Sequence, residues 1–594
     1  MIKNLIKKYN INVYGMIKNG TIAIITMVGV GYFFGVKNIM IAFPIALTSA
    51  VLGRQNFYVK TLYKVMWLLI IDIVIVITSF LSSINVYSGI LINFIMLFLI
   101  MYILISQYDL TFYKPFIMLY IFTQYTTVSI KELPERILSV VFGVLVITIL
   151  NYVKRINEKV VLGNSFLSYI KLLKSQVDNI KIHKFSDKLM DNGTKLMREI
   201  TYKVYITRHK KYLTTNLGII QFKLFINLEY FNLLLKDIYN ESLIGLRELN
   251  IISELLEKFT KYSEGSLGIG ALENNVMFFI KNNKQKNDTL SQICNIMLEL
   301  FESMEELSHI KKRDINKIYK QWERSELDLL KTSLSENFKG NNIRFKFAMR
   351  MSITLTLALL VGEFLGLYKI IWGVITIMAI MQPYYEDTIS NAKDRVKGNL
   401  IAILITTLII DIFNNKILTI SMLVIALYLL YGFKEFYKIS LFAAIASICI
   451  SSLTANVNLL IIYRGVYVIG GAIVVLIANR IIFPYKLKDG ITQLIDKIQR
   501  YNKCLVLNMK LYKDNTERGH KIRDIVIHQN LLLQKLNLRN IQYGSEKTNE
   551  FIKNNTKILI KAAYILFFED TSDNKRLKEV LKEYSEFNDK KYEI

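Results

Sequence analysis

The feature that most constrains this fold is a long apolar block that occurs twice. The blocks lie near residues 11–153 and 342–484 of a chain of 594 residues, and Ile, Leu, Val, Phe and Met dominate both. The motif Gly31-Tyr-Phe-Phe-Gly35 recurs about 330 positions later as Gly362-Glu-Phe-Leu-Gly366. A second motif keeps its spacing residue for residue, as Arg136, Gly143 and Asn151 and as Arg464, Gly471 and Asn479. Repetition at this period indicates that a whole membrane domain has been duplicated.

Each apolar block holds six candidate membrane helices. A bilayer core of about 30 Å needs roughly 20 apolar residues per helix, and fewer where a helix is short or broken. In the first block the sequence predicts helices at 16–36, 39–53, 65–83, 88–106, 113–130 and 135–153. In the second block it predicts helices at 347–367, 369–383, 397–412, 416–432, 438–454 and 462–483. Because an even number of spans gives both copies the same orientation, we expect a parallel repeat.

A polar block follows each apolar one, and both polar blocks carry helical patterning. They are rich in Lys, Glu, Asn and Asp and contain no proline. Their apolar residues recur at steps of three and four, as an amphipathic bundle helix requires. We therefore predict an all-α membrane protein with two parallel six-helix transmembrane repeats, each followed by a cytoplasmic helical domain. The predicted domains are transmembrane repeat 1 at 1–155, cytoplasmic domain 1 at 156–340, transmembrane repeat 2 at 341–485 and cytoplasmic domain 2 at 486–594.

The charged loops predict the orientation of the chain. Lys434 and Lys438 lie between two spans of the second block, whereas the loops at 82–87 and 455–458 carry no charge. Basic residues stay on the cytoplasmic side of a membrane. We therefore expect a multi-pass protein of the inner (plasma) membrane, with its N-terminus and both polar domains in the cytoplasm.

Several other classes of function have no support in the sequence. The net charge of +27 is explained by basic cytoplasmic segments, and no nucleic-acid-binding motif accompanies it. The three cysteines and five histidines lack the spacing of a metal site. The phosphate-binding pattern GxxxxGKS/T is absent. The sequence therefore predicts no enzyme, no cofactor, no metal and no nucleic-acid partner.

Two prolines suggest interrupted helices at corresponding places. Pro44 and Pro383 fall in the second predicted span of each block. Proline removes a backbone donor, and in lipid the freed carbonyl groups need partners from protein or water. Broken helices at matching places of two repeats indicate a binding site, whereas an ordinary kink packed against a neighbour is the alternative.

Residues of the second block resemble a known family. The block begins with Arg344-Phe-Lys-Phe-Ala-Met-Arg350, and its second span is followed by Gln382-Pro-Tyr-Tyr-Glu-Asp-Thr388 and by Lys393-Asp-Arg-Val-Lys-Gly-Asn399. These segments resemble the fusaric-acid-resistance-like (FUSC) family, relatives of the bacterial aromatic acid exporters. Members carry a basic Phe-Arg-x-Ala-x-Arg entry, then Gln-Pro, a Thr and an Arg-x-x-Gly-Thr run. Asn399 departs from the pattern because Thr is usual there.

The resemblance implies efflux of aromatic or other organic acids, with a homodimer and an accessory efflux subunit as candidate partners. Thr388, Arg395 and Asn399 are spaced by seven and four, so a continuous helix would present them on one face. An Arg fork can hold a carboxylate with two hydrogen bonds. The alternative is that these basic residues anchor the protein near lipid headgroups. The candidate substrate or translocation residues are Arg350, Gln382, Pro383, Thr388, Arg395, Gly398, Asn399 and Pro44.

Charged residues within the apolar blocks are further candidates. Asp72 lies near the middle of the third predicted span, where a carboxylate costs about 2.5–3.5 kcal/mol and should face a cavity or a basic partner. It is therefore a candidate for proton coupling, with a structural ion pair as the alternative. Arg136 and Arg464 lie nearer the predicted outer ends. They could form a matched outer anion gate or anchor the sixth helix of each block.

Together these features predict a secondary transporter in the inner membrane that exports organic, aromatic carboxylic acids. Its predicted partners are the lipid bilayer and the small organic anion, and its driving force is the membrane potential or proton exchange. Two alternatives remain at this stage. One is a gated organic-anion channel, and the other is a membrane scaffold that does not transport and binds partners through its cytoplasmic bundles.

Overall fold

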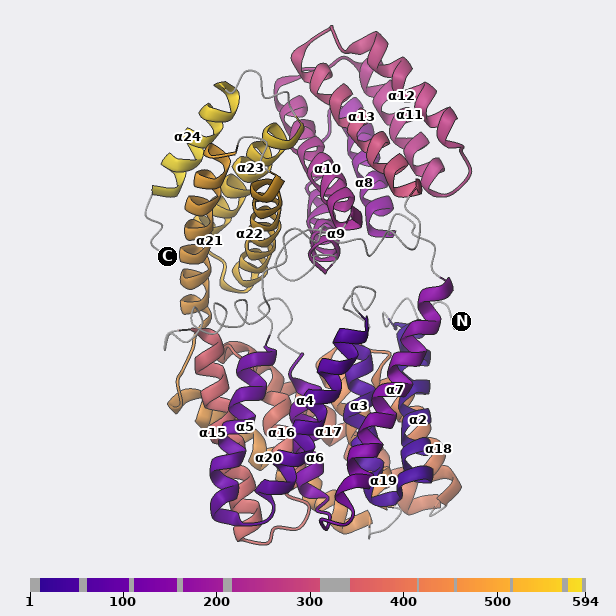
Figure 1. Cartoon of the computed structure of the whole chain (residues 1–594), viewed down its shortest axis with the longest axis vertical. Helices are drawn as coiled ribbons and strands as arrows, with labels where there is room; N and C mark the ends of the chain where they lie inside the picture. The colour runs from indigo at the N-terminus through magenta and orange to yellow at the C-terminus, as the bar shows by residue number, and fades with distance from the viewer. Residues whose placement is uncertain are drawn as a thin grey trace. The chain divides into compact units, whose positions relative to one another are not determined.

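Every regular element in the described part of the chain is a helix, and the helices form two compact units. Unit 1 combines Met1–Ile156 with Leu327–Gly490, and unit 2 combines Asn157–Glu326 with Ile491–Ile594 (Figure 1). Each apolar block therefore pairs with the other apolar block, and each polar block with the other polar block. The computed structural model describes residues 11–52, 61–105, 112–157, 164–206, 216–309, 342–413, 416–452, 457–512, 516–568 and 575–589.

The apolar blocks form their helices in the predicted order. The described residues of the first block contain α2 (Val13–Phe34), the short 3₁₀ helix η1 (Val36–Asn38), α3 (Ile39–Leu52), α4 (Thr61–Ser82), α5 (Val86–Leu104), α6 (Lys114–Tyr125) and α7 (Leu133–Asn157). Those of the second block contain α15 (Ile343–Phe364), α16 (Ile371–Ile380), α17 (Tyr385–Phe413), α18 (Lys416–Leu430), α19 (Phe436–Ser452) and α20 (Val457–Ile481). The predicted ends at residues 53 and 106 lie outside the described residues.

The largest difference from prediction concerns α17. The sequence predicted a span from residue 397, but the helix begins twelve residues earlier, at Tyr385. Charged side chains such as Lys393 lower the hydropathy of its first turns, so an apolar window misses them. The helix can begin there because Pro383 separates it from α16, and proline is compatible with the approach to a helix but not with its interior.

Six of these helices are long and apolar enough to cross a membrane. They are the segments Val13–Phe34, Val65–Ser82, Val86–Leu104, Leu133–Leu150, Ile343–Phe364 and Leu459–Ile481. Four shorter apolar helices accompany them, at Ile39–Thr48, Ile371–Ile380, Lys416–Leu430 and Phe436–Ser452. The chain is therefore an all-helical, multi-pass membrane protein, and crossing by the remaining predicted spans stays a prediction.

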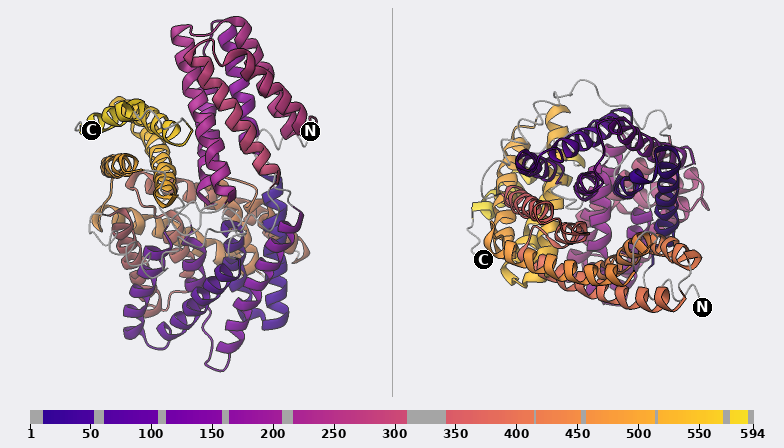
Figure 2. Two further views of the ribbon diagram at one scale, coloured as in Figure 1. Left: turned by 45° about the horizontal axis from the view of Figure 1, so that its top comes forward. Right: turned by 90° about the horizontal axis from the view of Figure 1, so that it is seen from below.

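The two apolar blocks contact each other reciprocally within unit 1. The first helix of each block packs against the fourth helix of the other, since α2 contacts α18 and α15 contacts α5. Viewed along the helices, the first block lines one side of unit 1 and the second block the opposite side (Figure 2, right). At the contact of α2 with α18, the hydroxyl groups of Thr21 and Tyr428 are 3.2 Å apart.

A repeated glycine brings the sixth helix of each block close to the second. A Cβ atom on Gly143 of α7 would lie 2.7 Å from the Ile45 side chain of α3. A Cβ atom on Gly471 of α20 would lie 3.1 Å from the Thr376 side chain of α16. Small residues allow such close backbone approach between membrane helices. The spacing that the sequence repeats thus corresponds to the same pair of packed helices in both blocks.

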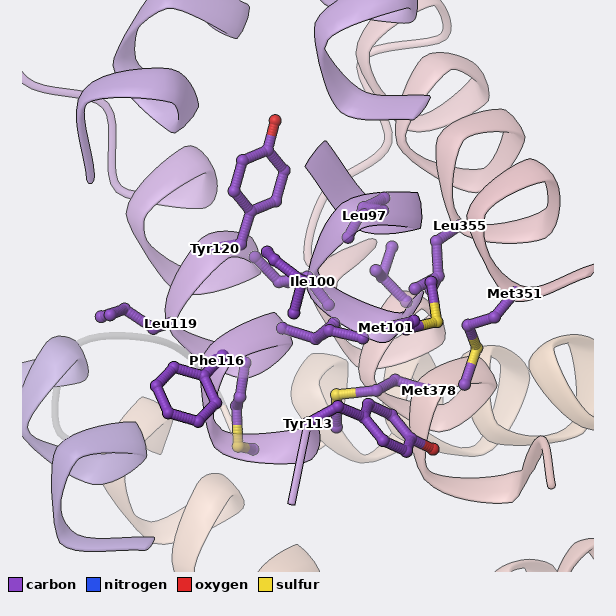
Figure 3. Packing of buried hydrophobic residues seen from close by; sticks show 14 of the residues in the cluster. Leu97, Ile100, Met101, Tyr113, Phe116, Leu119, Tyr120, Met351, Leu355 and Met378 are labelled. Atoms are coloured by element: carbon purple, nitrogen blue, oxygen red, sulfur yellow. The ribbon is translucent and has the colours of Figure 1, made fainter. Parts of the chain in front are cut away.

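Helices of both blocks share one apolar core. Leu97 and Met101 of α5 meet Met351 and Leu355 of α15, and Met378 of α16 lies beside them (Figure 3). All five side chains are buried. Methionine is unbranched and adapts to irregular gaps, so this core tolerates small displacements between the blocks better than a core of branched residues would.

Unit 2 is a bundle built from both polar blocks. The first polar block contributes α8 (Asn164–Lys181), α9 (Asp187–Ile206), α10 (Asn216–Glu241), α11 (Leu246–Ser263), α12 (Ile269–Asn283) and α13 (Asp288–His309). The second contributes α21 (Leu487–Lys510), most of which belongs to unit 2, α22 (Thr516–Tyr543), α23 (Glu546–Phe568) and α24 (Lys575–Asp589). The rings of Tyr230 on α10 and Tyr564 on α23 stack at 3.9 Å and join the two blocks.

The carboxyl group of Glu229 is buried inside unit 2. Glu229 of α10 is 8% exposed and accepts a hydrogen bond of 3.0 Å from the hydroxyl of Tyr169 on α8. Burial raises the pKa of Glu229 to about 7, because a carboxylate loses its hydration there, and the Tyr169 hydrogen bond offsets only part of this. The folded bundle therefore holds a proton in a pH range where an exposed glutamate has lost it.

We predict that Glu229→Gln removes a pH dependence from the stability of unit 2. Between the ordinary pKa of 4.5 and the folded value of about 7, the folded state binds more protons than the unfolded state. Stability should therefore fall as pH rises through this window, by up to about 3 kcal/mol for this group. Hydrogen exchange of α8 and α10 in the full chain, corrected for intrinsic rates, measures the change.

The matched control is Glu264→Gln, because Glu264 forms an exposed ion pair with Lys171 at 2.5 Å. This control should retain the wild-type pH dependence. If Glu229→Gln also retained it, the buried carboxyl group would not be its source.

Candidate functional site

Arg350 holds together the connection between α16 and α17. Its side chain projects from α15 and donates hydrogen bonds to the carbonyl oxygens of Gln382 at 2.7 Å and Pro383 at 2.9 Å. A longer bond of 3.4 Å reaches the carbonyl of Phe483. The helical ladder is interrupted here, so these carbonyl groups have lost their helical donors. The guanidinium group replaces those donors and ties three segments of unit 1 together.

Thr388 completes the same arrangement from the first turn of α17. Its hydroxyl accepts a hydrogen bond of 3.1 Å from the backbone N–H of Gln382 and donates to the carbonyl of Tyr384 at 3.0 Å. Four predicted site residues are therefore brought together: Arg350, Gln382, Pro383 and Thr388. We call this group the proline clamp. Its hydrogen bonds satisfy backbone groups of the protein itself.

Pro44 is in a different setting from Pro383. It lies inside the continuous helix α3, whereas Pro383 lies between α16 and α17. The carbonyl oxygen of Pro44 accepts a hydrogen bond of 3.0 Å from the hydroxyl of Thr48. The two prolines occupy corresponding regions of the sequence, but among the described residues only the second one marks a break between helices.

A second group of predicted residues meets deeper in the second block. Asn399 of α17 accepts a hydrogen bond of 2.9 Å from Nε of Arg464 on α20. The Asn399 amide also donates to the backbone carbonyl of Arg395, one turn earlier, at 2.8 Å. Arg395 follows Tyr385, the first residue of α17, by ten residues, which is about 15 Å along the helix. Arg395 is thus well separated from the proline clamp.

The two guanidinium groups of this site lack acidic partners. Arg395 is 5% exposed and Arg464 is 2% exposed. Nε of Arg395 is buried without a hydrogen-bond partner. Arg395 acts electrostatically on Arg464, and no carboxylate in the described part of the chain acts appreciably on either. We call Arg395 and Arg464, joined by Asn399, the arginine pair.

Trp372 was not predicted from the sequence, and it orients the arginine pair. The guanidinium carbon of Arg464 lies 5.2 Å from the centre of the Trp372 ring on α16. Trp372 is itself 4% exposed, so the contact is desolvated and contributes on the order of 2 kcal/mol. A tryptophan near the start of an apolar helix is typical of a membrane-interface anchor. Nothing in the sequence therefore indicated that Trp372 belongs to this site.

Gly398 is a packing residue beside the arginine pair. A Cβ atom at this position would lie 2.4 Å from the backbone oxygen of Tyr437 and 3.0 Å from the backbone nitrogen of Leu441 on α19. Glycine therefore allows α17 and α19 to approach closely. This contact fixes the rotation of α17 and with it the direction in which Arg395 projects.

Arg136 and Arg464 occupy corresponding places in the two blocks but have different partners. Arg136 donates to Asn38 Oδ1 at 3.1 Å, to the carbonyl of Thr123 at 2.9 Å and to Thr126 Oγ1 at 3.1 Å. Arg464 has one such bond within the described residues, to Asn399. The protein satisfies much of the donor capacity of the first arginine and leaves most of that of the second one unused. The predicted outer gate by this pair remains a prediction.

Asp72 is buried at the middle of α4, in the first block, whereas the arginine pair belongs to the second block. It is 3% exposed and forms no ion pair or hydrogen bond with any described residue. Seven residues later on the same face, Ser79 accepts a hydrogen bond of 2.8 Å from the Thr123 hydroxyl. The carbonyl of Thr123 is in turn bound by Arg136. The polar residues beyond Asp72 were missed by the sequence analysis, although their spacing on α4 could have indicated them.

The described ranges hold no candidate metal-binding cluster. No group of three or more His, Cys, Asp or Glu side chains there lies close enough to hold a metal ion.

We predict that Arg350→Gln destabilises unit 1. The substitution removes the Arg350 donor from two buried carbonyl groups: that of Pro383 loses its bond of 2.9 Å, and that of Gln382 keeps only the longer bond of 3.3 Å from the Thr388 hydroxyl, at a cost of about 2 to 4 kcal/mol. The unfolding midpoint of the detergent-solubilised full chain should fall clearly. Lys397→Gln serves as the control, because Lys397 is exposed and lies 5.1 Å from the centre of the Tyr437 ring. A stable Arg350→Gln protein that loses anion binding would instead make Arg350 a ligand residue.

Comparison with known proteins supports the motif resemblance. Residues 357–478 match the family described as fusaric acid resistance protein-like. No curated protein and no solved structure matches the chain significantly. The matched segment contains Trp372, the proline-clamp residues Gln382, Pro383 and Thr388, and the whole arginine pair. The expected resemblance is thereby confirmed over this segment, which is similar to the fusaric acid resistance protein-like family.

Proposed function

We propose that this chain exports organic acids and that the arginine pair binds their carboxylate groups. The observation that carries the proposal is the burial of two guanidinium groups without an acidic partner. A buried charge is costly unless it is paired. Arginine offers a planar fork that matches a carboxylate with two parallel hydrogen bonds. A bound organic anion supplies the missing partner.

The proposed architecture is two parallel six-helix repeats with both polar blocks in the cytoplasm. Support comes from the reciprocal contacts of α2 with α18 and of α15 with α5. Support also comes from the repeated glycines Gly143 and Gly471, which join the sixth helix of each block to the second. Basic residues favour the cytoplasmic side for the polar blocks. The anion then passes between helices of unit 1 rather than through unit 2.

Charge makes export of an anion favourable in this arrangement. A membrane potential that is negative inside drives an anion outward by about 2.3 kcal/mol per charge for each 100 mV. The arginine pair lowers the cost of bringing that charge into the bilayer. The site must also release its ligand, and within the described residues only one hydrogen bond, from its Nε to Asn399, holds the guanidinium group of Arg464.

Asp72 is the proposed proton-coupling group. A carboxyl group at mid-membrane without a basic partner is more stable when it is protonated. Uptake of a proton from outside and its release inside would require the group to be alternately exposed to each side. Such alternating exposure requires the two blocks to shift relative to each other. The apolar core that they share contains methionines, among them Met101 and Met351, whose side chains can adapt to a small shift.

We predict that Arg395→Gln and Arg464→Gln each abolish efflux while the protein still folds. Glutamine keeps hydrogen-bonding capacity but removes the charge that the anion requires, so export should fall by at least about tenfold. Export of a panel of labelled aromatic and aliphatic acids from cells, normalised to the amount of protein in the membrane, measures the effect. Lys397→Gln is the matched control on the same helix and should export normally. Unchanged export in both arginine variants would reject the proposed site.

We predict separately that Asp72→Asn removes the pH dependence of efflux. Asparagine mimics the protonated carboxyl group and cannot release a proton. Efflux from the variant should therefore respond to the membrane potential but not to a pH gradient. Reconstituted vesicles in which the two gradients are imposed independently provide the measurement. A variant that still responds to the pH gradient would leave Asp72 with a structural role.

A further inference from the structure

We infer that the arginine pair selects an organic anion that carries two negative charges over a singly charged one. This inference rests on the proposed function, because it specifies the charge of the cargo at the same site. It follows from the number of charges that the site leaves uncompensated rather than from the shape of a cavity.

The first step is the charge of the site. Arg395 and Arg464 are both buried, and each carries a full positive charge. The hydrogen bond recorded for the Arg464 side chain goes to the amide oxygen of Asn399, which is neutral. Nε of Arg395 has no acceptor. The site therefore carries a charge of about +2 before any ligand binds.

The second step is the neutrality of the surroundings. Trp372, against which Arg464 packs, carries no charge. Asp394 adjoins Arg395 in the sequence but does not act appreciably on it. Within the described segments of unit 1 neither arginine forms a salt bridge, whereas other pairs do, such as the partly buried Lys438 with the exposed Glu435 at 2.8 Å. Counterions for the pair therefore have to come from the ligand.

The third step compares two ligands of the same shape. A singly charged anion neutralises one guanidinium group and leaves the other charge buried and unpaired, which is the costly case. An anion with two charges neutralises both. Interactions between charges are much stronger in a buried site than in water, so the second charge should improve affinity by at least about tenfold.

The first block provides an internal contrast. Arg136 is as deeply buried as Arg464, but three neutral acceptors, Asn38, Thr123 and Thr126, occupy its donors. It also lacks a recorded neighbour equivalent to Arg395, and the carboxylate of Glu132 acts on it. Arg136 is thus a single charge that the protein satisfies internally. We therefore expect one anion site per chain, in the second block.

Matched pairs of probes test this inference directly. Terephthalate and its monoamide, terephthalamate, have nearly the same shape but differ by one charge. Succinate and succinamate form the corresponding aliphatic pair. Calorimetric titration of the purified full chain in nanodiscs at about pH 8 keeps all carboxyl groups ionised. We expect the doubly charged member of at least one pair to bind at least about tenfold more tightly, with one site per chain.

Variants of Arg395 and Arg464 test whether the preference for the doubly charged probe depends on both positive charges. Arg395→Gln and Arg464→Gln should each reduce the ratio of affinities within a pair to near one, because a single positive charge remains. Lys397→Gln should leave the ratio unchanged. If one of the two variants fails to fold, the other still shows whether the affinity ratio depends on both charges. The affinity ratio of the wild-type protein decides the inference even if both variants fail to fold.

Two results would overturn the inference while the proposed function stands. One is equal affinity within both pairs, and the other is binding of two singly charged probes per chain. Export of organic acids by cells together with failure of both doubly charged probes to bind would also overturn it. If the wild-type protein exports none of the labelled acids in the whole-cell assay, the proposed function itself is rejected. The two failures are therefore distinguishable.

Discussion

The arrangement of unit 1 depends on how it accommodates positive charge in an apolar setting. Arg350 and Arg464 are both buried, and the protein treats them in opposite ways. Arg350 donates to backbone carbonyl groups that a proline has left without partners. Arg464 donates to the Asn399 amide and lies within electrostatic range of a second arginine, Arg395. The first use stabilises the fold, and the second is the basis of the proposed anion site.

The same contrast divides the family motif into two groups of residues that are close in sequence but differ in their contacts. Gln382, Pro383 and Thr388 act with Arg350 at the start of α17, where their backbone groups and one hydroxyl satisfy each other. Arg395 lies about 15 Å further along the helix. A motif that appears continuous in sequence thus has one half that bonds to the protein's own backbone and another half that forms the proposed anion site. Gly398 supports the second half by allowing α19 to pack closely.

The sequence was informative about the helices and much less so about their partners. Apolar runs and the repeated glycines placed the helices of both blocks in order, because membrane helices are defined by local composition. The start of α17 was placed too late, since Lys393 and its charged neighbours interrupt the apolar run. The meeting of Arg464 with Asn399 could not be predicted, because the two residues are 65 positions apart and nothing between them signals the packing of α20 on α17. Trp372 was missed because a tryptophan near the start of an apolar helix is also typical of a membrane-interface anchor.

A structure of the full chain in nanodiscs with terephthalate bound is the most direct test of the central claim that the arginine pair is the anion site. The account predicts one ligand between Arg395 and Arg464, with Trp372 against the guanidinium group of Arg464, and no ligand at Arg136. A ligand bound elsewhere in unit 1, or an acidic side chain of the protein occupying the space between the two guanidinium groups, would contradict it.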